Sequence, residues 1–174
     1  MLDGMPALDR PMPPLNADER ATLEGWLDFY RATLALKCSG LDEEQVRKAS
    51  VPPSPLTLLG LVQHLAEVER NWFRRVLLGE DVQAIYESTP NADGHDGGFD
   101  LHEDVTFEAA FGVWEGEGAL ARSNCAGRAL DETSPFLGGE VTLRWIYAHM
   151  IAEYARHGGH ADLIRERIDG GTGV

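Results

Sequence analysis

Four segments of the chain repeat apolar residues at steps of three and four, and this pattern limits the possible folds more than any other feature. In the first segment, Leu27, Tyr30 and Leu34 fall on one side of a helix. The predicted helices span residues 17–37, 56–78, 106–129 and 142–168. No segment shows a convincing strand pattern. The sequence therefore predicts an all-α fold, a four-helix bundle.

The connectors between these segments differ in length. Three prolines within residues 51–55 rule out a helix there, because proline lacks the amide donor. Residues 80–104 are too many for a simple hairpin and permit a long crossover between helices two and three. Residues 134–139 read as a turn. We expect a flexible N-terminal leader at residues 1–15, the bundle at residues 16–169 and a loose C-terminal tail at residues 170–174.

The composition excludes several classes of partner. The 174 residues include 29 acidic and 15 basic side chains, for a net charge of −14. Such a surface repels phosphate backbones, so we expect no nucleic-acid partner. No apolar stretch is long enough to cross a bilayer and no export signal is visible, so we expect a cytoplasmic protein with no membrane partner. Cys38 and Cys125 are then expected to be reduced, half-buried thiols.

The last predicted helix carries a column of polar residues. His149, Glu153 and His157 are four apart and therefore lie one above another on one face. Glu153 and His157 also fall on the apolar stripe, where a polar group must find a partner. His64 lies on the inward face of the second helix. His64, Glu153 and His157 are the candidate ligands of one divalent metal ion.

This ligand set leaves choices open. Two imidazoles and one carboxylate would leave zinc one open position, as in catalytic sites, and nickel, iron or manganese would accept the same ligands. The alternative is that His64 is a hydrogen-bonded core residue and that Glu153 and His157 are an ordinary helical pair. From the residues alone, the two interpretations have about equal weight.

The remaining histidines and the tryptophans have less defined roles. His149 is the candidate catalytic residue, as a group that binds substrate or orients Glu153. His160 is expected at the exit of the site or exposed to solvent. His95 and His102 lie in the polar connector, where no role is expected. All four tryptophans are expected in the core rather than on a binding surface; they are Trp26, Trp72, Trp114 and Trp145.

Two blocks of sequence resemble a known family. Residues 59–73 (LGLVQHLAEVERNWF) and 144–162 (RWIYAHMIAEYARHGGHAD) are similar to the second-helix and last-helix motifs of the DinB-like superfamily, in its actinobacterial branch. The resemblance implies a four-helix bundle of the DinB type with a metal site at one end. The superfamily commonly uses three histidines. Glu153 departs from that pattern but is similar to the His, Glu, His set of mycothiol-dependent maleylpyruvate isomerases.

The resemblance also implies a reaction. Several relatives are thiol-dependent transferases or isomerases that use mycothiol, so the expected function is a metal-dependent S-transferase in which a mycothiol thiolate attacks a small electrophile. Two alternatives stay open. One is a non-enzymatic metal- or ligand-binding stress protein, and the other is a metal-dependent hydrolase with His149 as its base. The expected partners are the small-molecule thiol and the electrophile, and a homodimer is left open.

Overall fold

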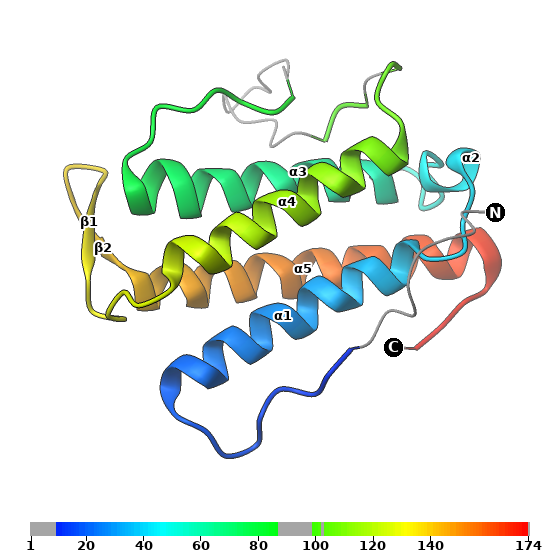
Figure 1. The fold of residues 1–174 in the computed structure, drawn as a ribbon. Coiled ribbons are helices and arrows are strands. Elements are labelled where there is room, and N and C mark those ends of the chain that lie inside the picture. Colours follow the sequence, from blue (N-terminus) through cyan, green and yellow to red (C-terminus); the bar gives the residue numbers. More distant parts are fainter. Residues whose placement is uncertain (1–9, 87–98, 102, 174) are drawn as a thin grey trace. The chain divides into compact units, whose positions relative to one another are not determined.

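The computed structural model describes residues 10–86, 99–101 and 103–173, and these residues are mostly helical (Figure 1). Four longer helices follow the predicted segments closely. They are α1 (Glu19–Cys38), α3 (Leu58–Arg70), α4 (Phe107–Cys125) and α5 (Leu143–Asp169). The described chain also contains a short helix α2 (Glu43–Val46), a π-helical segment η1 (Asn71–Val76) and two strands, β1 (Thr133–Phe136) and β2 (Gly139–Thr142).

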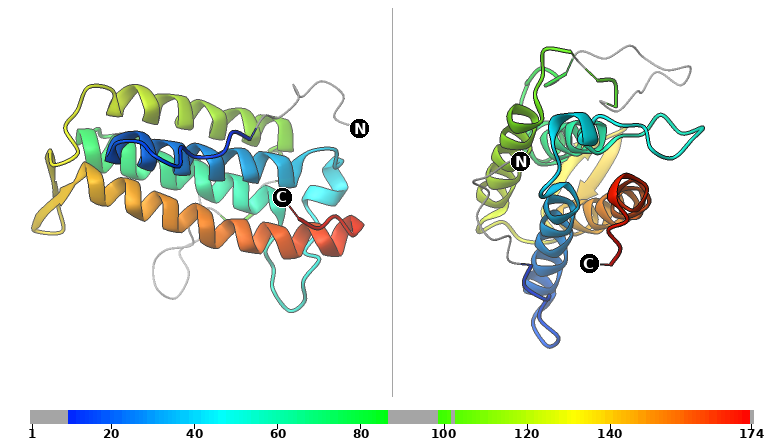
Figure 2. Two further views of the ribbon diagram at one scale, coloured as in Figure 1. Left: turned by 90° about the horizontal axis from the view of Figure 1, so that it is seen from below. Right: turned by 90° about the vertical axis from the view of Figure 1, so that its right-hand side faces the viewer.

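The strands correct the prediction that the chain has none. β1 and β2 pair antiparallel, with Phe136 opposite Gly139, and β2 leads directly into α5 (Figure 2). Leu137 and Gly138 form the turn with φ angles of 48° and 78°, as mirror-image hairpin turns require. Each strand has only four residues, and Pro135 breaks the β pattern of the first, so residues 134–139 looked like a plain turn.

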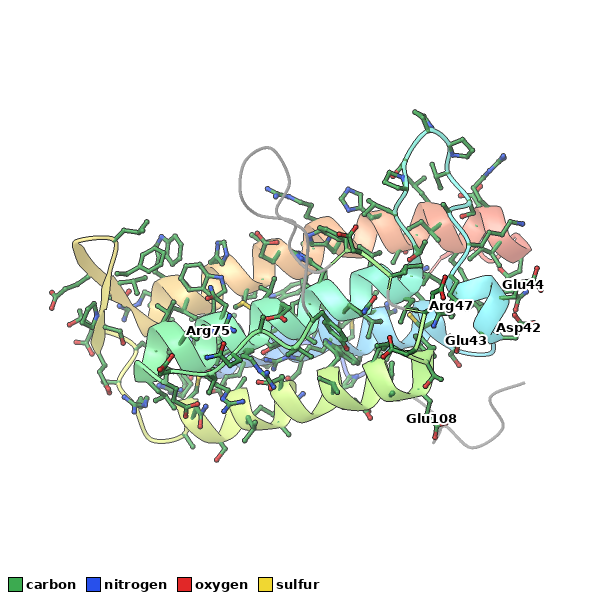
Figure 3. All side chains as sticks on the ribbon, turned by 90° about the horizontal axis from the view of Figure 1, so that it is seen from above. Asp42, Glu43, Glu44, Arg47, Arg75 and Glu108 are labelled. Atoms are coloured by element: carbon green, nitrogen blue, oxygen red, sulfur yellow. The ribbon has the colours of Figure 1, made fainter. Side chains whose placement is uncertain are left out.

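The helix α2 lies in the segment between the first two predicted helices, which the sequence predicted to be a connector without helix. The Asp42 side chain accepts a hydrogen bond from the Gln45 amide, and the Gln45 side chain accepts one from the Asp42 amide, each at 2.9 Å. This reciprocal capping holds a helix too short to show periodicity. Arg47 donates to Glu43 at 2.6 Å, and Figure 3 shows both beside Asp42.

The described chain divides into two compact units. The first contains α1, α2 and the C-terminal part of α5, from Ile151 onward. In it, the buried Lys37 ammonium lies 2.8 Å from the Asp162 carboxylate, and Arg165 donates to the carbonyls of Lys37 and Ser39 at 3.0 and 2.7 Å. These bonds join the end of α1 to the last turns of α5.

The second unit, residues 62–150, contains most of α3, all of η1 and α4, the hairpin and the first two turns of α5. A largely buried ion pair joins α4 to α3. The Glu117 carboxylate, only 5% exposed, accepts hydrogen bonds from Arg70 at 2.9 and 2.5 Å and from Arg74 at 3.3 Å. Ser134 of the hairpin donates to the Leu77 carbonyl at 2.9 Å, which ties β1 to the end of this helix.

No helix in residues 10–86 or in the described part of 99–173 is both long and apolar enough to cross a membrane.

Candidate metal centre

Helix α5 brings Glu153 and His157 together. The four-residue spacing places both side chains on one face, and His157 Nε2 lies 3.4 Å from Glu153 Oε2. His157 is buried and Glu153 is half-buried, at the edge of the apolar stripe that contains Met150 and Tyr154. The pair is thus mostly shielded from water, which strengthens its interaction with any ion.

The separation of these two atoms suits two ligands of one metal ion. Two ligand atoms about 2.1 Å from a tetrahedral zinc ion lie roughly 3.4 Å apart. A direct N–H···O hydrogen bond is shorter, at about 2.7–3.2 Å. The observed 3.4 Å therefore fits shared coordination better than a hydrogen bond between the two side chains.

His160 contacts His157 from one turn further along α5. The two Nδ1 atoms lie 3.3 Å apart, and the His160 ring is half-buried. When His157 binds a metal ion through Nε2, its Nδ1 carries the proton and can donate it to His160 Nδ1, since a neutral imidazole has one donor and one acceptor. This contact was not predicted from the sequence, although the i,i+3 spacing places the two histidines next to each other on one face of α5.

His64 lies on α3, in the second unit, and is described by itself. Its ring is 9% exposed and stacks on Phe99, with ring centroids 4.2 Å apart and planes at 16°. The neighbours Leu61 and Leu65 are fully buried, so the predicted inward face of this helix is confirmed. A buried imidazole with one face on an aromatic ring has a fixed orientation, as a metal ligand requires.

His149, the candidate catalytic residue, lies among aromatic rings. It is half-buried, its ring is nearly parallel to that of Trp145, and Trp72 contacts it as well. The prediction that all four tryptophans are core residues is wrong for two of them, because Trp145 is 48% exposed and Trp26 is 39% exposed. His95 and His102 lie outside the described residues.

Neither cysteine is suited to act as a nucleophile. Cys38 and Cys125 are both buried, as small apolar residues are. Burial raises the pKa of the Cys38 thiol to about 12, although the charge of Arg165 opposes the shift. At neutral pH this thiol stays protonated. A reaction at sulfur on this protein therefore needs a thiol from outside the chain.

Comparison with known families shows the family to which the chain belongs. A family model described as Mycothiol-S-transferase matches residues 22–170. The chain belongs to the mycothiol-S-transferase family. The match covers both sequence blocks and every candidate ligand, and it confirms the expected resemblance to the DinB-like, mycothiol-related proteins. A search of curated proteins finds no significant match to this mycothiol-S-transferase family member.

Proposed function

We propose that this protein is a divalent-metal-dependent S-transferase that joins mycothiol to a small electrophile. The family match over residues 22–170 carries the proposal, because the description of the family names mycothiol as the thiol and S-transfer as the reaction. The buried, high-pKa Cys38 supports it, since the reacting sulfur is then that of the co-substrate. We also infer that α1, α3, α4 and α5 build a DinB-type four-helix bundle across residues 16–169.

The proposed metal ligands are His64, Glu153 and His157. These three side chains form a group that could hold one metal ion. The 3.4 Å separation of the Glu153 and His157 ligand atoms supports this assignment. Two imidazoles and a carboxylate favour zinc, and the same set accepts nickel, iron or manganese. Three protein ligands leave a position for an exogenous atom, which is the arrangement of a catalytic rather than a structural site.

The bound metal would lower the pKa of the mycothiol thiol, so that the sulfur reacts as a thiolate near neutral pH. Each protein residue then has a separate task. Glu153 offsets part of the positive charge, His160 fixes the ring of His157, and the buried His64 limits access of water. We assign His149, one turn before Glu153 on α5, to accept the thiol proton.

The transfer itself needs no oxidant or reductant. The sulfur lone pair forms a new S–C bond with the electrophile, and the leaving group departs with the electron pair of the bond that breaks. The thiol proton passes to His149 and then to solvent. Where the electrophile is a conjugated double bond, that proton ends on the neighbouring carbon instead.

The test is a thiol-loss assay with purified protein, mycothiol and a broad panel of electrophiles. We expect mycothiol to disappear faster than in a protein-free control, and the acceleration to vanish in His157→Ala. Glutathione in place of mycothiol tests whether the family's thiol is recognised. Absence of any metal-dependent loss of mycothiol across the panel would refute the proposed activity.

A further inference from the structure

Four aromatic side chains of the second unit form one cluster, here called the aromatic shelf: Trp72, Phe136, Trp145 and His149. Trp72 is its centre, with ring centroids 5.1 Å from Phe136, 5.2 Å from Trp145 and 4.5 Å from His149. Trp145 and His149 stack at 5.0 Å with planes only 6° apart. The shelf joins three separate segments of the chain around one set of rings.

The shelf is open to solvent at Trp145. Trp72 is 8% exposed and forms the base, whereas Trp145 is 48% exposed and leaves about half of its surface accessible. A tryptophan at this exposure, held flat by a stacked imidazole, presents a rigid apolar face to water. Such faces mark binding sites more often than isolated exposed residues do.

Two unusual backbone conformations position the shelf. Trp72 belongs to the π-helical segment η1, a geometry that is rare and is frequently found at functional sites. Leu137, next to Phe136, adopts a φ of 48°, which is unfavourable for a branched side chain, and its side chain is 91% exposed. Both irregularities lie beside the same cluster, and such irregularities often occur at functional sites.

Two residues of the shelf and two of the proposed ligands lie on one helix. On α5, Trp145, His149 and Glu153 follow one another at four-residue steps, and each step advances about 6 Å along the helix. Trp145 therefore lies about 12 Å along α5 from the proposed ligand Glu153.

We propose that the aromatic shelf binds the planar, conjugated part of the electrophile. This inference rests on the proposed function for the identity of the reaction, though not for the binding itself. Indole and imidazole faces are rich in π electrons and stack best, offset, on electron-poor rings. Electron-poor conjugated carbons are also the ones that a thiolate attacks. The shelf thus selects aromatic or unsaturated electrophiles over small saturated ones.

The first test compares two electrophiles, 1-chloro-2,4-dinitrobenzene and iodoacetamide. In each, an S–C bond forms, the carbon–halogen bond breaks and the halide leaves with the electron pair. Trp145→Ala should lower kcat/KM for 1-chloro-2,4-dinitrobenzene about tenfold, while kcat/KM for iodoacetamide should stay within about twofold of the wild type. Trp145→Phe should recover most of the lost kcat/KM.

The matched control is Trp26→Ala. Trp26 is 39% exposed and its ring also lies in an aromatic cluster, with Phe29 at 5.7 Å and Tyr30 at 5.8 Å, but on α1 in the first unit. Trp26→Ala should change kcat/KM for neither electrophile. An equal loss of both rates in Trp145→Ala, or an equal effect of the two tryptophan changes, would overturn the proposal.

The second test measures binding without reaction. Calorimetric titration of the full chain with unreactive 2,4-dinitroaniline should show binding that weakens about tenfold in Trp145→Ala and not in Trp26→Ala. If no electrophile reacts, the proposed function fails, yet this binding pattern would still support the shelf. Absence of dinitroaniline binding to the wild type overturns the shelf proposal even if the transferase activity is real.

Discussion

The ion pair between α4 and the α3–η1 helix gives the sharpest prediction of stability. Glu117→Gln keeps the size of the side chain and removes the negative charge that Arg70 and Arg74 approach at 2.5–3.3 Å. Breaking a buried pair by removing one partner costs about 3–5 kcal/mol. The two arginine side chains are about one-fifth exposed, Arg70 also donates to the Gln83 carbonyl, and Arg74 keeps Glu80 at 2.7 Å.

These retained contacts and the partial exposure of the guanidinium groups reduce the expected loss to about 2–3 kcal/mol. For a chain of this length, such a loss lowers the melting temperature by roughly 5–10 °C. Urea unfolding followed by circular dichroism measures the free energy directly, provided that the slope m is unchanged.

The control is Glu24→Gln. Glu24 pairs with Arg20 at 2.8 Å, but the two side chains are 44% and 30% exposed, so we expect a change below about 0.5 kcal/mol. If Glu117→Gln is also within about 0.5 kcal/mol of the wild type, the reasoning that this pair stabilises the second unit is wrong.

Two further predictions concern single side chains. His160→Leu removes the acceptor for His157 Nδ1–H and should weaken metal binding about 10–100-fold in a chelator competition. His160→Gln keeps an acceptor and should weaken metal binding less. Equal metal affinity of the wild type and the two variants would contradict the role of the contact. The folded-state pKa of Cys38 is about 12, against 9.0 for an ordinary thiol. Cys38 should therefore resist a disulfide reagent at pH 8 until the chain unfolds. Its contribution to stability should be complete below about pH 9 and lost as the pH rises toward 12. A Cys38→Ala variant with the same alkaline stability profile as the wild type would contradict the second prediction.

The four long helices were predictable because each has enough turns to show an apolar stripe. In α5, Ile146, Met150 and Tyr154 are buried at steps of four, as the periodicity indicates. The shorter elements were not predictable in this way. The four residues of α2 complete only one turn, and each strand of the hairpin has only two residues per face.

The backbone irregularities also left no sign in the sequence. A switch from α- to π-helical hydrogen bonding at Asn71 changes no residue type and only shifts the direction of the following side chains. Leu137 occupies a turn position where glycine or asparagine is usual, so the residue type did not indicate a two-residue hairpin turn between strands. The exposure of Trp145 was missed because a large apolar side chain was assumed to be buried, although Trp145 lies beside the stripe that contains Ile146.

The ligand types of the candidate site could be predicted from the sequence, but the orientations of its side chains could not. The i,i+4 spacing of Glu153 and His157 was enough to place their ligand atoms together, as the 3.4 Å separation confirms. The role of His160 depends on a ring rotation, and sequence spacing does not specify that rotation.

The most direct test of the metal centre is elemental analysis of protein purified without chelators and incubated with zinc. The wild type should retain about one divalent ion per chain after desalting, and His64→Ala, Glu153→Ala and His157→Ala should each lose most of it. His149→Ala should retain the metal, since this residue is assigned to the proton and not to the ion. A wild type that retains no metal, or three ligand variants that retain as much as the wild type, would contradict the proposed centre.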